Sequence, residues 1–519
     1  MTRSFREDFE RICGEQSKQR ALLDSKTGRV LTYGTLFESV KGFGKFISKA
    51  GAKPSDRLFS VLPNSVEQLV ACLAALWSGI DFCPISPLST NEEIYRFIEL
   101  CEGAIGLVPH NMDPALAEDL RSVCKKKILL SIETNGDLTD YLGNFETEES
   151  LSSPQSGKLI LFTSGTTSSP KAMVIDGNRL WSSAVAWVEF HEFLNQESRF
   201  YNILPMSYLG GLFNLGLIPL AVGGSTVISD SFSAATILKF WREVEEYGVN
   251  TLWLAPTMLR SLLQFYRPVK KEKVAWKNVR VAFLGMSGIQ LQEKKSFEDA
   301  FKIPLFENYA LSETTFLTSE KEGEDAIRVP GSVGSVLPWV SLRLESAGDD
   351  ENVKEIQVKT PYLLDGYLSL GGKIELPLTG DGWFKTGDLG LFRQNTLILK
   401  GRSKDIVKKG GYLILLRDLE SVAEAHPAVA EAAAIGIEHS FYGESAALCL
   451  QLLKGEVSSA SVLLEVKALL EKKLSKFKWP TEIHIVSSFP KTESGKIQKR
   501  KMAERLKSRQ DVLESIQLH

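Results

Sequence analysis

The segment from Leu161 to Lys171, LFTSGTTSSPK, joins an apolar run to a lysine through a loop of small and hydroxyl residues. Hydroxyl groups donate hydrogen bonds to phosphate oxygens, a glycine lets backbone N–H groups approach an anion, and a lysine adds a compact positive charge. The spacing is not that of the P-loop, since Pro170 precedes the lysine and Ala172 follows it. The loop therefore predicts a nucleotide phosphate grip of another kind, made by Thr163, Ser164, Gly165, Thr166, Thr167 and Lys171.

Taken alone, the same composition also fits an exposed Ser/Thr linker, so other segments must decide. Five follow along the chain: NYALSE (308–313), GWFKTGD (382–388), KGRSKD (400–405), GGYLI (410–414) and PKTESGK (490–496). Tyr309 offers an aromatic face for a purine, Glu313 a hard oxygen for Mg²⁺, and Asp388 an acceptor for ribose hydroxyls. Arg402 and Lys496 add positive charge. Each residue has an ordinary structural interpretation by itself, but together they can surround one ATP.

In this order the six segments resemble those of the adenylate-forming superfamily, which contains acyl- and aryl-CoA synthetases, peptide-synthetase adenylation domains and firefly luciferase. The resemblance spans roughly residues 30 to 500, and the GWFKTGD and PKTxSGK strings are diagnostic. It implies ATP-dependent activation of a carboxylic acid to an acyl-adenylate, release of pyrophosphate, and transfer of the acyl group to a thiol, with coenzyme A as the expected acceptor. Two alternatives stay open: an acyl-AMP ligase that loads a separate acyl or peptidyl carrier protein, and a non-catalytic nucleotide-binding relative.

The resemblance also implies roles for individual residues. The loop from Thr163 to Lys171 would close over the β- and γ-phosphates, and Tyr309 would stack on adenine. Ser312 and Glu313 would lie near the α-phosphate, with Glu313 as the Mg²⁺ ligand, while Asp388 and Arg402 would hold the ribose. The implied catalytic residues are Lys171, Glu313 and Lys496, the implied hinge residue is Lys404, and the Gly410–Gly411 pair would approach the acceptor tunnel.

Lys496 also has a physical argument of its own. A carboxylate that attacks an α-phosphate brings two anions together, and a cation between them offsets their repulsion and fixes the in-line geometry. The same position cannot hold this lysine and an incoming thiol. Two arrangements of one small C-terminal domain are therefore expected, with Lys404 and Asp405 at the crossover.

The chain departs from the family pattern around the expected acyl pocket. Tyr208 stands where many acyl-CoA synthetases have histidine, and the aspartate that grips an α-amino group in peptide-synthetase domains is absent. Amino-acid substrates are therefore disfavoured. Bulk from Met286 favours a short or medium carboxylate over a very long chain. The predicted pocket residues are Tyr208, Met286, Gly288 and Leu311.

Composition limits the class of protein. With 519 residues, 43% hydrophobic and 24% charged, the chain predicts two or more globular domains. A net charge of −3 gives no basic field for nucleic acid, and no partner of that kind is expected. Six cysteines without a C-x-x-C pair argue against zinc and a disulfide scaffold. The N-terminus lacks a signal-peptide core, and the uncharged stretch 200–229 is interrupted by prolines and glycines. We expect a cytoplasmic enzyme without a transmembrane segment.

The alternation of short apolar runs with helical patterns over the first 340 residues predicts an α/β fold. We expect a large N-terminal AMP- and acyl-binding domain (1–400) of helix-covered, mostly parallel sheets with a small β-rich subdomain at 332–399. A hinge at 401–405 would lead to a small, mobile α+β lid domain at 406–519. The predicted strands include 57–62, 105–108, 159–163, 200–204, 225–228, 251–255 and 279–284.

Overall fold

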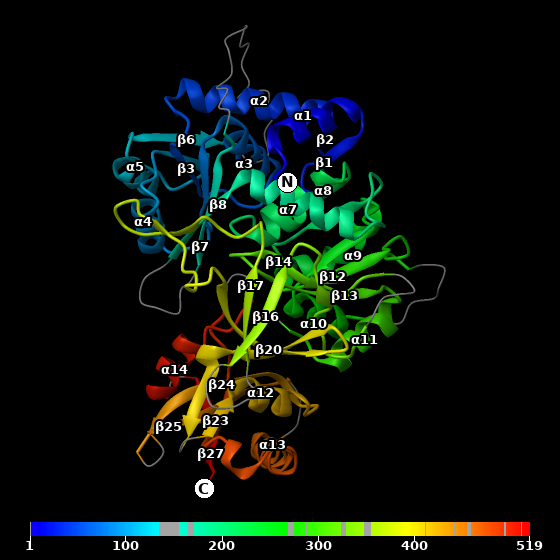
Figure 1. The fold of residues 1–519 in the computed structure, drawn as a ribbon, viewed down its shortest axis with the longest axis vertical. Coiled ribbons are helices and arrows are strands. Elements are labelled where there is room, and N and C mark those ends of the chain that lie inside the picture. Colours follow the sequence, from blue (N-terminus) through cyan, green and yellow to red (C-terminus); the bar gives the residue numbers. More distant parts are fainter. Residues whose placement is uncertain are drawn as a thin grey trace.

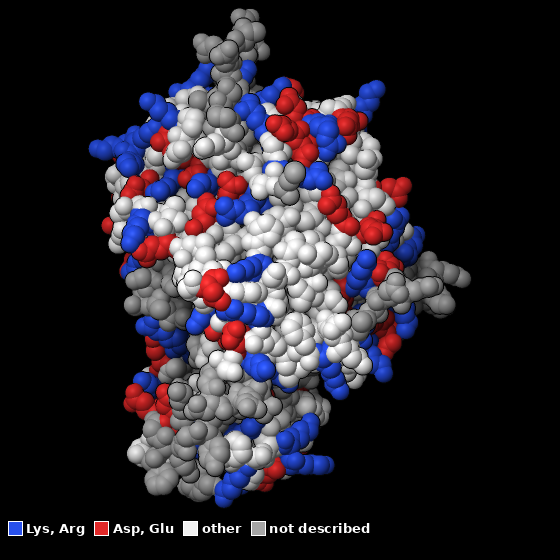
Figure 2. Space-filling view, in the orientation of Figure 1, with Lys and Arg blue, Asp and Glu red and all other residues white. Residues whose placement is uncertain are grey.

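A computed structural model describes residues 2–133, 155–163, 171–267, 274–286, 288–322, 328–346, 354–409, 412–440, 443–453, 458–492, 495–509 and 511–518. Two large sheets with their helices form the N-terminal part, and the last elements of the chain gather at its lower end in Figure 1. On the face drawn in Figure 2, lysine and arginine side chains are interspersed with aspartate and glutamate. The α/β architecture expected from the alternating pattern is confirmed.

The first sheet has eight strands in the order β19-β18-β8-β7-β4-β3-β5-β6. Its central strands from β6 to β7 run parallel, while β8, β18 and β19 add to one edge in antiparallel pairs. These strands are β3 (Arg57–Ser60), β4 (Asp81–Pro84), β5 (Ile105–Pro109), β6 (Ile128–Ile132), β7 (Lys158–Thr163), β8 (Lys171–Asp176), β18 (Gly366–Leu368) and β19 (Ile374–Glu375).

The second sheet has thirteen strands in the order β16-β17-β20-β21-β15-β14-β13-β12-β11-β9-β10-β1-β2. From β1 to β13 the neighbours run parallel, and from β13 to β16 they run antiparallel. Most of the β-rich region therefore extends this sheet, whereas β18 and β19 join the first sheet. The strands are β1 (Arg20–Asp24), β2 (Val30–Thr32), β9 (Arg199–Asn202), β10 (Ser225–Ile228), β11 (Thr251–Leu254), β12 (Val281–Leu284), β13 (Leu305–Leu311), β14 (Thr315–Ser319), β15 (Ser335–Val336), β16 (Ser341–Ser346), β17 (Lys354–Lys359), β20 (Phe384–Arg393) and β21 (Thr396–Arg402).

Helix α3 (Val66–Ser78) lies between the two sheets, since it contacts β4 of the first and β1 of the second. All its residues are buried because the sequence VEQLVACLAALWS is apolar on almost every side. The Ser65 side chain accepts a hydrogen bond from the Gln68 N–H at its start, and Gly79 ends it with φ of 72°. The other N-terminal helices are α1 (Phe5–Glu15), α2 (Tyr33–Lys49), α4 (Asn91–Leu100), α5 (Pro114–Val123), α7 (Gly177–Phe190), α8 (Ile218–Ala221), α9 (Ala234–Glu246), α10 (Pro256–Gln264) and α11 (Leu291–Phe301).

An aromatic cluster fills the space between α7 and the second sheet. Trp187 from α7 packs on Phe316 of β14 at a ring-centroid distance of 3.8 Å and on Trp253 of β11 at 5.4 Å. Phe283 of β12 lies 4.9 Å from the Trp253 ring. These four side chains are almost completely buried. Their burial packs α7 against strands β11, β12 and β14 of this one sheet.

The C-terminal part has its own sheet and its own core. Strand β21 ends at Arg402, a short 3₁₀ turn covers Ser403–Asp405, and a six-stranded sheet follows. Its strands are β22 (Ile406–Lys409), β23 (Tyr412–Leu415), β24 (Val429–His439), β25 (Gly443–Leu452), β26 (Glu482–Val486) and β27 (Val512–Gln517). Its helices are α12 (Leu416–Glu424), α13 (Ser459–Lys473) and α14 (Lys499–Lys507).

The predicted strands are confirmed, with ends that agree or differ by one or two residues. The stretch 200–229 forms β9, a π-helix at Gly210–Leu217, α8 and β10. The Asn202 side chain donates hydrogen bonds to the Gly211 and Leu215 carbonyls at 2.9 and 3.2 Å, and so satisfies backbone groups of the π-helix. Within the described part of the chain, none of the helices has the length and apolarity needed to span a bilayer.

Two glycines with positive φ allow a test of the junction between β14, β15 and β21. A Cβ on Gly334 (φ 87°) would lie 2.0 Å from the Ser319 carbonyl carbon, whereas a Cβ on Gly331 (φ 77°) would meet nothing within 4 Å. Gly334→Ala should destabilise the protein by roughly 3 kcal/mol or more, and Gly331→Ala by about 1–2 kcal/mol of conformational strain alone. Thermal unfolding midpoints compare the two variants, and equal shifts would contradict a backbone clash at Gly334.

Candidate active site

A buried carboxylate joins three strands of the second sheet. Asp388 on β20 accepts a hydrogen bond from the Tyr309 hydroxyl at 2.7 Å and pairs with the Arg402 Nε at 2.9 Å. Asp388 and Arg402 are opposite each other in the β20–β21 ladder, and Tyr309 comes from β13. The Tyr309 pKa is raised well above 10, first by burial and then by the Asp388 charge, so the phenol stays a hydrogen-bond donor. Three predicted nucleotide-binding residues, far apart in sequence, thus form one cluster.

Glu313 lies in the turn between β13 and β14. Its Oε1 accepts a hydrogen bond from the Tyr367 hydroxyl at 2.8 Å, and its backbone carbonyl accepts one from the Leu364 N–H at 2.8 Å. Tyr367 is on β18, whose next residue Leu368 pairs with Ala172 on β8. The structure therefore brings Glu313 to the edge of the first sheet, next to the strand that begins at Lys171.

The predicted phosphate loop connects β7 and β8. The backbones of Thr163 and Lys171 pair with each other at the ends of these antiparallel strands. Ser164, Gly165, Thr166 and Thr167 lie outside the described residues, as does the Gly410–Gly411 pair. Ser312 is half-buried in the same turn as Glu313.

The loop that contains Lys496 packs against the large part of the molecule. Its backbone N–H donates to the Thr492 hydroxyl at 3.1 Å, and its carbonyl accepts from the Thr492 N–H at 2.8 Å. The neighbouring Gly495 packs on Thr257, since a Cβ there would lie 2.9 Å from the Thr257 Oγ1. Thr257 belongs to the first turn of α10, directly after β11. Lys496 thus lies beside the end of a parallel strand, where such sheets bind ligands.

The predicted acyl-pocket residues come together in part. The Met286 methyl group lies against Gly210, at 2.8 Å from where a Cβ on that glycine would be. Gly210 starts the π-helix and follows Tyr208 by two residues. Met286 is 44% exposed, and Leu311 is half-buried at the end of β13. A Cβ on the exposed Gly288 would meet no described atom within 4 Å, so this position opens to free space.

Several residues that support the site have no motif in the sequence. Asn64 donates to the Leu204 carbonyl and accepts from the Met206 N–H, each at 2.9 Å, and so holds the segment before the π-helix. Tyr367 follows Glu313 by 54 positions, and Thr257 precedes the Lys496 loop by more than 200. Only the three-dimensional contacts identify them.

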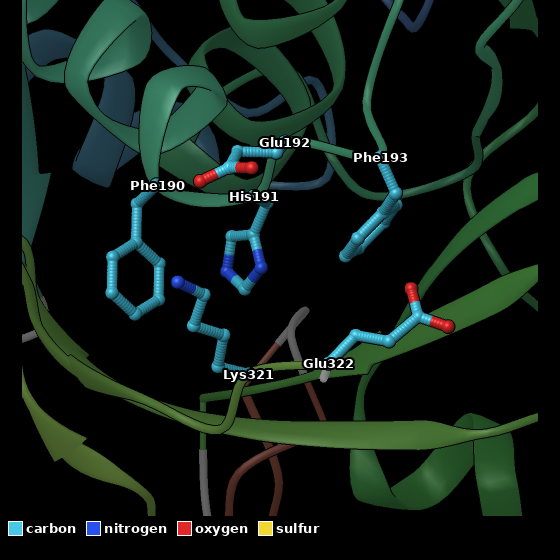
Figure 3. Close-up of a pocket in the computed structure, with 6 residues that line it drawn as sticks. All are labelled: Phe190, His191, Glu192, Phe193, Lys321 and Glu322. Carbon is cyan, nitrogen blue, oxygen red and sulfur yellow. The ribbon is translucent and has the colours of Figure 1, made fainter. Parts of the chain in front are cut away.

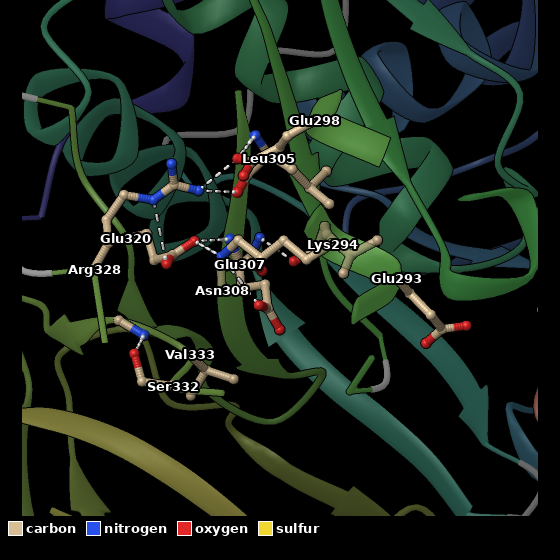
Figure 4. Close-up of polar contacts among 12 residues, drawn as sticks. Glu293, Lys294, Glu298, Leu305, Glu307, Asn308, Glu320, Arg328, Ser332 and Val333 are labelled. Carbon is tan, nitrogen blue, oxygen red and sulfur yellow. Dashed lines mark hydrogen bonds and ion pairs between the residues drawn. The ribbon is translucent and has the colours of Figure 1, made fainter. Parts of the chain in front are cut away.

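A network of buried charges supports β13 (Figure 4). Lys294 of α11 pairs with Glu307 of β13 at 3.1 Å and with Glu320 directly after β14. The Glu320 carboxylate also accepts the Glu307 backbone N–H at 2.8 Å, and the Arg328 Nε lies 3.5 Å from it. Burial, countered by the Lys294 charge and reinforced by Glu320, raises the Glu307 pKa from 4.5 to about 7. The network anchors the strand two residues before Tyr309.

The hollow drawn in Figure 3 holds none of the predicted site residues; it is lined by Phe190, His191, Glu192, Phe193, Lys321 and Glu322. Burial, and then the Lys321 charge, lowers the His191 pKa to about 3. The imidazole is therefore neutral near pH 7, and its Nε2 lies 3.2 Å from the Ser319 hydroxyl. The packing of its ring against Trp187 and Phe283 indicates a structural role.

The pKa of Glu307 gives a prediction for the stability of this scaffold. A carboxyl group whose pKa is higher in the folded than in the unfolded protein loses stabilising free energy as pH rises between the two values. From pH 4.5 to 7 the wild type should therefore lose up to roughly 3 kcal/mol of stability relative to Glu307→Gln. Unfolding midpoints across this range measure the difference. Glu99→Gln, at an exposed position of α4, is the control, and a difference independent of pH would contradict the assignment.

Two family models match most of the chain. Residues 9–368 match the AMP-binding enzyme family, and residues 418–496 match the AMP-binding enzyme C-terminal domain. An oxalate–CoA ligase of Arabidopsis thaliana is 27% identical, over 96% of this chain and 97% of that protein. A sulfoacetate–CoA ligase of Cupriavidus necator is 25% identical, over 93% and 94%.

Among solved structures, MatB from Rhodopseudomonas palustris is 26% identical and covers 97% of this chain, with 99% of its own chain matched. The TM-score is 0.84 for its ATP-bound form and 0.74 for its apo form. The overall arrangement of this chain is therefore more similar to the ATP-bound form.

Proposed function

The chain belongs to the AMP-binding enzyme family, and on that premise we propose that it converts a short carboxylic acid to its coenzyme A thioester through an acyl-adenylate. ATP supplies the adenylyl group, and the acid carboxylate displaces pyrophosphate from the α-phosphate. Coenzyme A then takes the acyl group and AMP leaves. The observation that carries the proposal is the pairing of Tyr309, Asp388 and Arg402, together with a Lys496 loop that rests on Thr257.

Each part of this arrangement has a chemical task. Asp388 presents a carboxylate already oriented by two partners, and such a group accepts hydrogen bonds from ribose hydroxyls. Lys496 supplies positive charge between the acid and the α-phosphate, where two anions must meet. Its loop places it at the end of β11, on the side where α10 begins.

Mg²⁺ is the expected companion of ATP, and the residues fit it. The Tyr367 hydroxyl donates to Glu313 Oε1 and so orients the carboxylate, whose Oε2 would bind the cation. No group of three or more potential metal ligands occurs among the described residues. This fits Mg²⁺, which proteins bind through one or two carboxylates together with substrate phosphates. Bound there, the ion would neutralise phosphate charge.

The substrate is proposed to be a short acid that carries a second anionic group. Oxalate and sulfoacetate, the acids named for two relatives that align along nearly the whole chain, share this property. The Met286 side chain against Gly210 limits the space beside the π-helix, in keeping with a small acyl group.

A panel of acids tests the activity and the substrate class together. Purified protein with Mg-ATP and coenzyme A should release pyrophosphate with oxalate, sulfoacetate or succinate faster than with acetate, butyrate or octanoate. Mass spectrometry of the products separates the acceptors: acyl-CoA is the expected product. Acyl-adenylate that accumulates despite coenzyme A would favour a separate carrier protein, and no pyrophosphate release with any acid would favour a non-catalytic nucleotide-binding protein.

Replacement of the proposed catalytic lysine gives a sharper test. Lys496→Ala should lower the rate of acid-dependent pyrophosphate release by about 10²–10³ because the two anions then meet without a cation between them. Transfer from a supplied acyl-adenylate to coenzyme A should change much less. Lys507→Ala, at an exposed position of α14, is the control. Retention of full adenylation activity by Lys496→Ala would contradict the assigned role.

A further inference from the structure

Among the described residues, three contacts join the small C-terminal part to α10 and to the start of α11. Gly495 packs on Thr257, Arg260 lies 3.9 Å from Glu431, and the Gln290 amide donates to Glu424 at 3.3 Å. On the large part, the contacts use the first two turns of α10 and the residue that precedes α11. They therefore form one interface over two neighbouring helices.

Glu431, at the start of β24, connects two of these contacts. Its Oε2 pairs with the Lys491 Nζ at 2.6 Å, and its Oε1 faces Arg260. Lys491 starts the loop that carries Lys496 and closes it by pairing with Ile497. The Glu431 side chain is only 13% exposed, so solvent screens these charges weakly. One carboxylate thus joins the lysine loop to the large part.

The partners of Glu431 are themselves fixed. Arg260 donates from its Nε to Glu293 of α11 at 2.6 Å, which orients its guanidinium toward the interface. Glu424 pairs with Arg417 of its own helix at 3.1 Å and also accepts the hydrogen bond from the Gln290 amide. Because each partner has a second contact on its own side, the interface defines one orientation of the small part.

We propose that Glu431 is a positioning residue that registers the Lys496 loop on α10, and so stabilises the orientation in which the acid is adenylated. The inference rests on the proposed function of Lys496. The better match to the ATP-bound form of MatB than to its apo form supports this orientation. The incoming thiol must occupy the position that Lys496 holds during adenylation. The Glu431–Arg260 contact must therefore open before the second half-reaction. Loss of Glu431 should then slow adenylation selectively.

Half-reaction kinetics test the proposal. Glu431→Gln keeps the shape of the side chain and removes its charge. It should lower kcat for acid-dependent pyrophosphate release about tenfold, with KM for ATP changed less than about twofold. Transfer from a supplied acyl-adenylate to coenzyme A should keep its rate. Arg260→Gln should act in the same direction, and the double variant should be less impaired than the product of the single effects, because both remove one contact.

Glu438→Gln is the matched control, since it changes an exposed glutamate on the same strand. Equal loss in both half-reactions would indicate a general structural role for Glu431 and overturn the proposal. Unchanged adenylation by Glu431→Gln would overturn it as well.

A measurement of how the small part is oriented on the large part tests the role of Glu431 independently of the proposed function. Cysteines at positions 290 and 424 report the interface without turnover, and the six native cysteines are buried. A short bis-maleimide should cross-link the Gln290→Cys/Glu424→Cys protein several-fold more slowly with Glu431→Gln than with Glu438→Gln. Equal rates would overturn the role of Glu431 even if the enzyme is active. Absence of pyrophosphate release by the wild type, with a slower cross-link in Glu431→Gln, would instead refute the proposed function alone.

Discussion

The Asp388 carboxylate is the point on which the candidate site depends. A carboxylate this deeply buried is stable only when it is paired, and here a phenol and a guanidinium provide the partners. The pairing ties β13, which carries Tyr309, to β20 and to the last residue of β21. Directly after that residue the chain enters the 3₁₀ turn and then the small sheet. The same contacts that orient a proposed ribose ligand thus fix the place where the two parts of the molecule meet.

The large and the small parts of the molecule differ in how they are held. Strand β13 is anchored by Lys294 and two buried glutamates on one side and packs against the aromatic cluster of the second sheet on the other. The described contacts of the small part with the large one include an ion pair, an amide hydrogen bond, a packed glycine and a small apolar cluster of Leu389 with Leu415. An extensive buried core is costly to break, whereas an interface of a few contacts involves much less buried surface. In the proposed reaction, this difference would allow the small part to change orientation while the proposed nucleotide-binding residues keep their geometry.

Much of the fold followed from local sequence. The strands at 57–60, 105–109 and 251–254 are short, mostly apolar runs that alternate with amphipathic helices along the chain. Parallel sheets are the arrangement that buries such runs on both faces. The π-helix at 210–217 could not be predicted, because the Asn202 side chain that satisfies its carbonyls comes from a neighbouring strand. The sequence also did not predict that most of the β-rich region continues the second sheet. That continuity depends on the pairing of β14 with β13 on one side and with β15 on the other.

By itself the sequence determined which chemical groups are present and in what order: the predicted phosphate loop, Tyr309, Glu313, Asp388, Arg402 and Lys496. Their types follow from the charges of a nucleotide and an acid, which only certain side chains can complement. Tertiary structure alone decided which groups meet, such as Asp388 with Tyr309, Glu313 with Tyr367, and Glu431 with Arg260. Pairing of this kind depends on strand order and on the orientation of the small part, and residues tens to hundreds of positions apart carry no local signal of it.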